Sequence, residues 1–128
     1  MTRSRPPLMP SQRQLRVAEE IRHILARILS RVDHFDDVIQ KAHVTVTEVR
    51  VSPDLKFAKV YIMPIGGRDK DIVLEALNKA ASFYRFEVGR QLTIKFTPAL
   101  QFRIDETFDQ VSRIETLLQS AHVKQDLQ

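Results

Sequence analysis

The spacing of hydrophobic residues changes several times along this chain of 128 residues, and the order of these changes limits the folds it can adopt. From Ser11 to Val32, apolar side chains recur every three to four residues, which is typical of a helix with one buried face. Ser11 and Gln14 form a capping-box pattern at its start. Val44–Val51 and Phe57–Pro64 are instead rich in β-branched residues and predict two strands.

The two predicted strands are joined by Ser52–Lys56, whose proline and aspartate favour a tight turn, so we expect a hairpin. The apolar residues of the first strand change phase. Val44 and Val46 share one face, whereas Val49 and Val51 point to the other. A β-bulge or burial of both faces would explain this change, and the sequence leaves both open.

After the hairpin, a helical pattern begins at Asp69 or Asp71 and runs to Arg90, with Gly89 as its expected C-terminal stop. One straight helix would place Glu87 on the apolar face. The misfit begins after Ala80, Ala81 and Ser82, so we predict two helices that meet at a kink near Ser82.

The last strand is predicted over Leu92–Ile104, where nearly every even position is apolar and Pro98 marks a bend or a sheet edge. Thr107 then opens a final helix. The order of elements predicts an α+β fold with a three-stranded sheet, helices packed on one face, and an extra C-terminal helix. We expect one domain over residues 11–121, a flexible basic tail over 1–10 and a C-terminal tail over 122–128.

Composition excludes several kinds of chemistry. The chain has no cysteine, and its three glycines build no phosphate-binding loop or dinucleotide fingerprint, so we predict neither an enzyme nor a cofactor. Asp33–Lys41 is a polar connection in which a solvated loop is favoured over a metal site, because no helical pair of histidines occurs there. No apolar run approaches the ~18 residues that span a bilayer, so we predict no membrane partner. The absence of cysteine suits a reducing cytosol, so we expect a cytoplasmic location.

Charge is unevenly distributed along the chain. Residues 1–32 hold seven arginines, no lysine and two glutamates, and residues 72–104 hold five basic and two acidic groups, whereas residues 105–128 are acidic. This asymmetry favours a polyanionic partner. Phe83 and Phe86 are candidates for stacking, with the core favoured for Phe83. The cations outside the apolar stripes are the candidate phosphate contacts: Arg13, Arg16, Arg27, Arg31, Arg85, Arg90 and Lys95.

Several segments, in order and at matching spacing, resemble the ribosome-binding factor A family of bacterial 30S assembly factors. They are Arg16–Ile21, Val44–Leu55, Ala58–Tyr61, Leu74–Asn78, Val88–Arg90, Thr97–Phe102 and Asp105–Glu106. The resemblance covers about residues 11 to 121 and implies a type II KH-like fold. Members of that fold grip nucleic acid with a Gly-x-x-Gly loop, which this chain lacks. The family has an Ala-x-Gly kink there, which corresponds to Ala80, Ala81 and Ser82, with serine in place of the glycine.

The resemblance also implies a function. The protein would bind the immature 30S subunit as a monomer, contact 16S rRNA near its 5′ end and the decoding neck, and assist 5′-end processing. It would be important in the cold and would leave the mature subunit with the help of an assembly GTPase. Recognition would rest on shape and charge rather than base reading.

Two other functions stay open at this point. The acidic C-terminal segment and the Asp33–Asp37 stretch could serve a protein-interaction adaptor that makes no direct RNA contact. A duplex-DNA binder is less favoured, because no helix-turn-helix pattern is recognisable.

Overall fold

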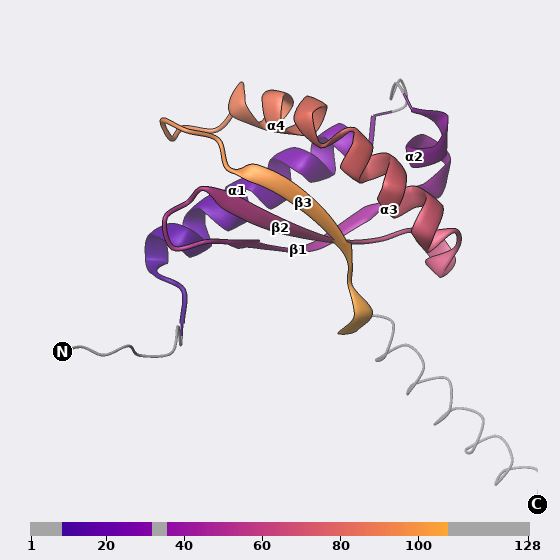
Figure 1. Ribbon diagram of the computed structural model, residues 1–128, viewed down its shortest axis with the longest axis horizontal. Coiled ribbons are helices and arrows are strands. Elements are labelled where there is room, and N and C mark those ends of the chain that lie inside the picture. Colours follow the sequence, from indigo (N-terminus) through magenta and orange to yellow (C-terminus); the bar gives the residue numbers. More distant parts are fainter. Residues whose placement is uncertain (1–8, 32–35, 108–128) are drawn as a thin grey trace, which may run out of the picture.

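Three strands form a single mixed sheet in the structure, a computed structural model that describes residues 9–31 and 36–107 (Figure 1). Strand β1 (Thr45–Val51) pairs antiparallel with β2 (Phe57–Met63), and β2 pairs parallel with β3 (Ala99–Ile104). The strand order is β1-β2-β3, so β3 lies at an edge of the described sheet. The hairpin is confirmed, but β3 is half as long as predicted, because Leu92–Pro98 is irregular.

The helices follow the predicted order with one addition. They are α1 (Gln12–Leu29), α2 (Asp37–Ala42), α3 (Lys70–Lys79) and α4 (Ala81–Gly89), with a 3-10 turn η1 at Ile65–Gly67. The predicted polar loop over residues 33–41 is wrong in its second half, which forms α2. Asp36 caps this helix by accepting the Ile39 N–H at 3.1 Å. The Asp36 carboxylate therefore caps the start of α2.

Helix α1 begins as the sequence predicts. The Ser11 hydroxyl accepts the Gln14 N–H at 3.1 Å, and the Gln14 side chain accepts the Ser11 N–H at 2.8 Å, which completes the capping box. The helix ends at Leu29, earlier than the predicted Val32.

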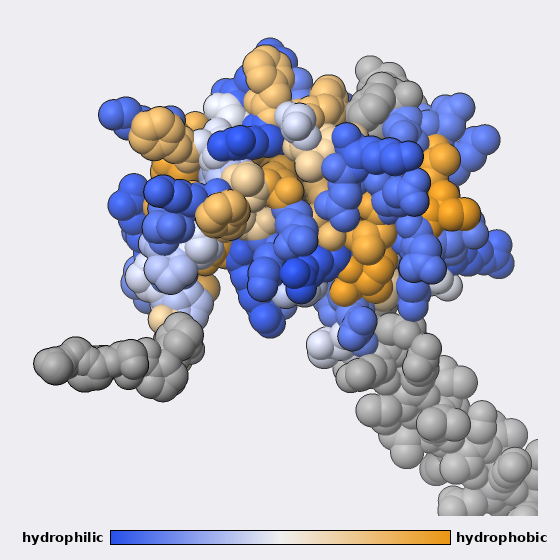
Figure 2. Space-filling model, in the orientation of Figure 1, coloured by the Kyte–Doolittle hydropathy of each residue, from blue (hydrophilic) through white to orange (hydrophobic). Residues whose placement is uncertain are grey.

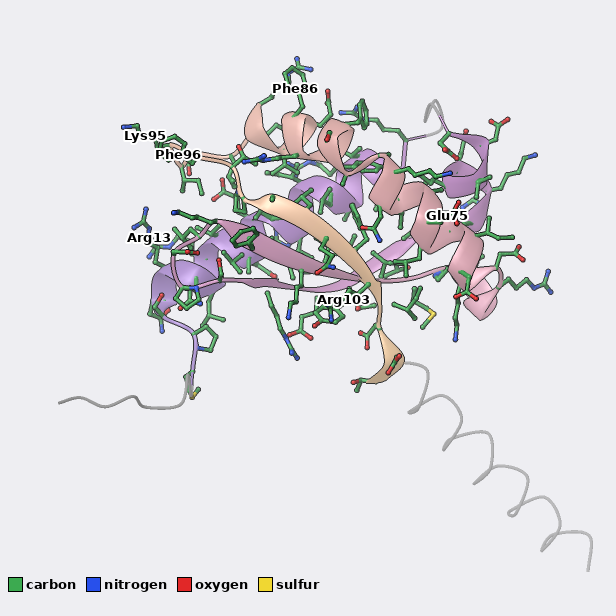
Figure 3. All side chains as sticks on the ribbon, in the orientation of Figure 1. Arg13, Glu75, Phe86, Lys95, Phe96 and Arg103 are labelled. Carbon is green, nitrogen blue, oxygen red and sulfur yellow. The ribbon has the colours of Figure 1, made fainter. Side chains whose placement is uncertain are left out.

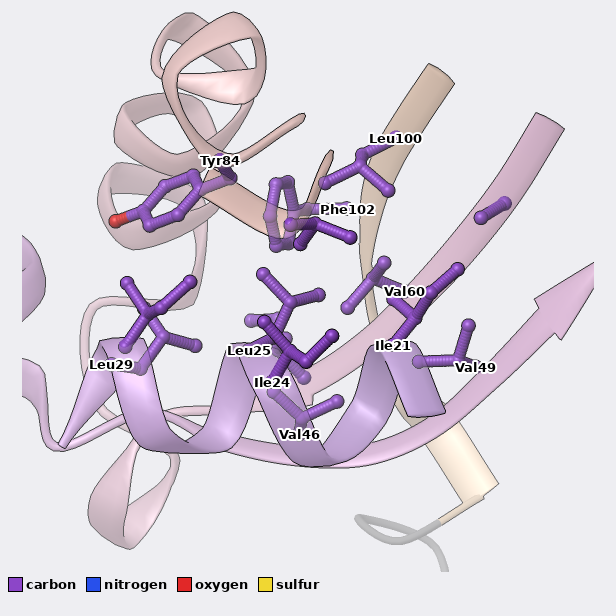
Figure 4. Packing of buried hydrophobic residues seen from close by; sticks show 14 of the residues in the cluster. Ile21, Ile24, Leu25, Leu29, Val46, Val49, Val60, Tyr84, Leu100 and Phe102 are labelled. Atoms are coloured by element: carbon purple, nitrogen blue, oxygen red, sulfur yellow. The ribbon is translucent and has the colours of Figure 1, made fainter. Parts of the chain in front are cut away.

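The helices pack against one face of the sheet, and the core lies between them and that face (Figure 4). Alternate residues of each strand are buried there, while their neighbours stay on the open face. A β-bulge resolves the phase change in β1, because the pairing shifts between Val46 and Glu48 and leaves Thr47 as the extra residue. Val46, Val49 and Val51 are therefore all buried together.

The break between α3 and α4 is confirmed and falls at Ala80, which has φ −95° and ψ 11°. Ser82 lies in the first turn of α4 and has no positive φ, so a serine can occupy this position without strain. The break keeps Val73, Leu77, Tyr84 and Val88 on one buried face.

Several predictions concern other parts of the chain. Most of the basic tail over residues 1–10, the helix after Thr107 and the tail over 122–128 lie outside the described residues. Among the residues that are described, no helix is long and apolar enough to span a bilayer. Within the same ranges, no three histidine or acidic side chains come together as a metal site.

Candidate nucleic-acid interface

An open groove of about 840 Å³ lies where the start of α1, the β1–β2 turn, α4 and the α4–β3 loop meet. Four cations and one carboxylate line it, together with two exposed phenylalanines. We call it the basic groove and define it by six residues: Arg13, Lys56, Phe57, Arg85, Lys95 and Phe96. Arg13, Lys95 and Phe96 lie at the same end of the molecule in Figure 3.

The β1–β2 turn forms one wall of the groove through hydrogen bonds among its own residues. The Ser52 hydroxyl donates to Asp54 Oδ1 at 2.6 Å, and the Lys56 N–H donates to the same oxygen at 3.1 Å. Both hydrogen bonds lower the pKa of the Asp54 carboxyl, and the bond from the Ser52 hydroxyl has the larger effect. The Phe57 N–H in turn donates to Ser52 Oγ at 3.0 Å. The one carboxylate among the described residues that line the groove is therefore engaged in its own turn.

The α4–β3 loop forms the opposite wall and is held by α4. Arg85 Nε and Nη2 both donate to the Thr97 carbonyl, at 3.1 and 2.9 Å. A Cβ built on Gly89 would lie 2.7 Å from Thr97 Oγ1, so the glycine allows the loop to lie against the end of α4. Gly89 does end α4 as predicted, but its C-cap is Arg90 in the right-handed region rather than a left-handed glycine.

The exposed face of α1 continues from the groove along the same loop. Glu20 Oε1 accepts the Thr93 N–H at 3.3 Å, and Arg27 Nη2 donates to Gln91 Oε1 at 3.1 Å. The residues after α4 therefore lie beside the exposed side of α1 that carries Glu20 and Arg27. These two contacts place the start of the α4–β3 loop alongside α1, between the basic groove and the far end of the helix.

A second cluster of cations occupies that far end. Arg31 Nη1 lies 4.0 Å from Glu87 Oε1, and Arg90 Nη1 lies 3.3 Å from Glu87 Oε2. The Glu87 side chain is only 13% exposed, whereas Arg31 and Arg90 are at least half exposed. We call these three residues the Glu87 cluster. Two candidate phosphate contacts thus share one carboxylate of their own chain.

The structure separates the seven predicted cations by their surroundings. Arg13, Arg85 and Lys95 line the basic groove, while Arg31 and Arg90 belong to the Glu87 cluster. Arg27 lies between the two groups and donates to Gln91. Arg13 and Arg16 are exposed, and among the described residues they have no hydrogen-bond or ion-pair partner. Arg85 differs from the others, because two of its nitrogens position the loop.

Sequence reasoning missed three residues of the groove: Lys56, Phe57 and Phe96. Lys56 is the last residue of the Ser52–Lys56 turn and Phe57 follows it, so the turn could have pointed to both. Phe96 follows the alternating pattern of a buried strand, yet it is 73% exposed because β3 begins only at Ala99. Figure 2 shows apolar surface interspersed with hydrophilic residues at this end of the molecule.

The two phenylalanines singled out in the sequence lie elsewhere. Phe83, favoured for the core, is 38% exposed and contacts Tyr84 edge-on with 5.3 Å between ring centroids. Phe86 is 66% exposed, and neither residue lines the basic groove.

Comparisons with known proteins support one family. Residues 13–118 match the family described as Ribosome-binding factor A. The chain is 53% identical over 117 residues to Ribosome-binding factor A of Bradyrhizobium sp. (strain ORS 278), covering 91% of this chain and 85% of that protein. It is also 53% identical over 118 residues to the protein of the same name from Methylobacterium sp. (strain 4-46), covering 92% and 85%.

Solved structures agree on the fold. The solution structure of a Thermotoga maritima protein matches with a TM-score of 0.62 at 27% identity, covering 75% of this chain and 90% of that one. The crystal structure of ribosome-binding factor A from Thermus thermophilus matches with a TM-score of 0.61 at 22% identity, covering 71% and 94%. A Thermus thermophilus homology model fitted into a cryo-EM map of a 30S complex matches with a TM-score of 0.50 at 24% identity, covering 66% and 90%. The KH-like α+β fold predicted from the sequence is confirmed.

Proposed function

The chain belongs to the Ribosome-binding factor A family, and on that basis we propose that it binds 16S rRNA in the immature small ribosomal subunit. The Thermus thermophilus protein of similar fold was fitted into a cryo-EM map of a complex with 30S, which supports the same partner here. The proposal includes assistance to 16S rRNA 5′-end processing, release with the help of an assembly GTPase, and action as a cytoplasmic monomer that matters most in the cold.

One observation carries the proposal: exposed cations from α1, the β1–β2 turn and the α4–β3 loop face one side of the molecule around the basic groove. Structured RNA presents phosphates and 2′-hydroxyls to such a surface. Binding one arrangement of the rRNA more tightly than another would shift the population toward it without covalent chemistry. We include Arg13, Arg16, Arg27, Arg31, Arg85, Arg90 and Lys95 in the proposed interface, with Arg85 acting chiefly on the loop.

Sedimentation of the full chain with purified immature 30S particles tests the proposal. Affinity should fall by about 0.7–0.9 log units for each phosphate contact per tenfold rise in salt. The double variant Arg13→Gln/Arg16→Gln should bind more weakly, and its salt slope should be smaller by the amount expected for about two phosphate contacts. Lys41→Gln/Lys79→Gln is the matched control, because it removes the same charge from exposed positions on α2 and α3.

Two results would overturn the proposal. One is an affinity that stays constant from low to high salt, and the other is an equal loss of binding in the control variant. The adaptor alternative makes the opposite prediction for nuclease treatment: RNase should release an RNA-binding protein from the particles, whereas an adaptor held by ribosomal proteins should stay.

A further inference from the structure

Two large aromatic rings are exposed in the basic groove. Phe96 is 73% exposed and Phe57 is 62% exposed, each next to a lysine in the sequence. Exposed aromatic rings do not help to keep a protein in solution, and they do not bind phosphate. Neither property explains why phenylalanine stands at these two positions. Flat apolar rings among cations are, however, the combination that single-stranded nucleic acid binds.

Both rings are presented on fixed backbone. Phe57 begins β2, and its N–H is bound by Ser52 in the turn that also binds the Lys56 N–H. Phe96 directly precedes Thr97, whose carbonyl is held by Arg85. Because α4 holds the loop and the turn is held by its own hydrogen bonds, the groove is largely formed before a ligand arrives. Preformed sites lose less conformational entropy on binding.

The surroundings of Phe96 suit a flat ligand. Lys95 Nζ lies 5.5 Å from the centroid of the ring, within cation–π distance of one face. With 73% of the residue exposed, ring surface remains accessible from the groove. Its volume of about 840 Å³ lies within the roughly 300–1,000 Å³ of sites that hold small organic ligands. The groove is therefore large enough for a nucleotide.

We propose that the basic groove binds an unpaired segment of RNA, with a base stacked on Phe96, a second apolar contact at Phe57, and phosphates beside Arg13, Lys56 and Lys95. This inference rests on the proposed function and adds that the RNA bound here is single-stranded. Bases in a duplex stack on one another, so their faces are closed to an aromatic side chain. The groove is not lined by Ala80, Ala81 or Ser82, so it is distinct from the helix junction where related folds carry their glycine loop.

A fluorescent reporter tests the stacking directly. The chain has no tryptophan, so Phe96→Trp introduces a single one into the groove. A short RNA oligonucleotide without self-complementarity should quench its emission. The same sequence annealed into a duplex should not, and an oligonucleotide with abasic sites should quench less. Equal quenching by all three ligands would overturn the inference.

Affinity measurements with the full chain give the second test. Phe96→Ala should weaken single-stranded RNA binding by about 5- to 150-fold, the range expected for losing one stacked base. The salt slope should stay as it is in the unmodified chain, because no charge is removed. Phe86→Ala is the matched control, since Phe86 is 66% exposed on α4 but does not line the groove.

The outcomes separate the two proposals. If 30S binding keeps its salt dependence while Phe96→Ala has no effect on any RNA, the groove inference is wrong and the proposed function stands. If Phe96→Ala weakens binding to intact 30S particles but not to free single-stranded RNA, a protein occupies the groove and the inference is again wrong. If the unmodified chain binds neither particles nor RNA, both proposals fail.

Discussion

The side-chain amide of Asn78 on α3 pairs with the backbone of Phe102 on β3. Asn78 Nδ2 donates to the Phe102 carbonyl at 3.1 Å, and the Phe102 N–H donates to Asn78 Oδ1 at 2.9 Å. Since β3 lies at the edge of the described sheet, the amide occupies backbone groups that another strand would otherwise use. One side chain thus joins a helix to the strand edge and covers part of that edge.

Replacing this amide should weaken the fold. Asn78→Ala leaves an N–H and a carbonyl of Phe102 without their partners, and we expect a loss of about 1–3 kcal/mol in the free energy of unfolding. Urea denaturation should show a lower midpoint at unchanged m-value. Lys79→Ala, at the neighbouring exposed position, is the control and should change stability by less than about 0.5 kcal/mol. Similar midpoints for the two variants would contradict the role of Asn78.

Gly89 should be an exception to the rule that alanine stabilises helices. A Cβ at this position would lie 2.7 Å from Thr97 Oγ1, and the β-branched Thr97 side chain has few alternative rotamers. Gly89→Ala should therefore cost about 1–3 kcal/mol of stability as overpacking. Adding Thr97→Ala removes the clashing oxygen, so the double variant should be more stable than the sum of the single effects predicts. Stabilisation by Gly89→Ala alone would show that the loop does not pack as described.

Tyr84 should make the fold sensitive to alkaline pH. Burial raises the pKa of its phenol above the ordinary value, and the nearby Asp36 carboxylate raises it further. The folded state therefore holds this proton more tightly than the unfolded chain. The resulting stability is fully present below about pH 10 and is lost as the pH rises toward the higher folded-state pKa, by up to ~1.4 kcal/mol per pH unit.

Comparison with Tyr84→Phe isolates this contribution. The variant keeps the ring that packs against Phe102, with 5.5 Å between ring centroids, but has no phenol to ionise. Urea unfolding above about pH 10 should show a steeper loss of stability for the unmodified chain than for the variant. Parallel curves for the two proteins would rule out Tyr84 as the cause.

Glu87 should moderate binding to RNA. Its carboxylate is shared by Arg31 and Arg90, so Glu87→Gln leaves both cations available for phosphate. Both arginines are at least half exposed, so each pair is of the surface kind, which contributes at most about 1 kcal/mol. We expect affinity for 30S particles to rise by less than about fivefold at low salt and the gain to shrink as salt screens the charges. Glu75→Gln is matched in charge and releases only Lys79 on α3. An equal rise in both variants would indicate a net-charge effect alone.

Local pattern was sufficient for much of the fold. The capping box at Ser11, the hairpin and the α+β class with one covered sheet face follow from periodicity and turn chemistry. So does the helix break, which is predicted near Ser82 and lies at Ala80. Hydrophobic spacing carries this information because a side chain's face is fixed by the period of its own element. Two errors arise because local pattern alone was used. Alternation continues through Leu92–Phe96 although no strand forms there, and the capping role of Asp36 was not recognised.

The sequence by itself determined the order of the elements, the apolar face of each helix and the presence of an arginine-rich surface on α1. Tertiary structure alone decided which cations meet a carboxylate, which one holds a loop and which aromatic rings face solvent: Arg90 meets Glu87, Arg85 binds Thr97, and Phe96 is exposed. The physical reason is the separation along the sequence over which each kind of interaction acts. Burial periodicity acts between residues a few positions apart, whereas ion pairs, loop anchors and grooves depend on segments that only folding brings together.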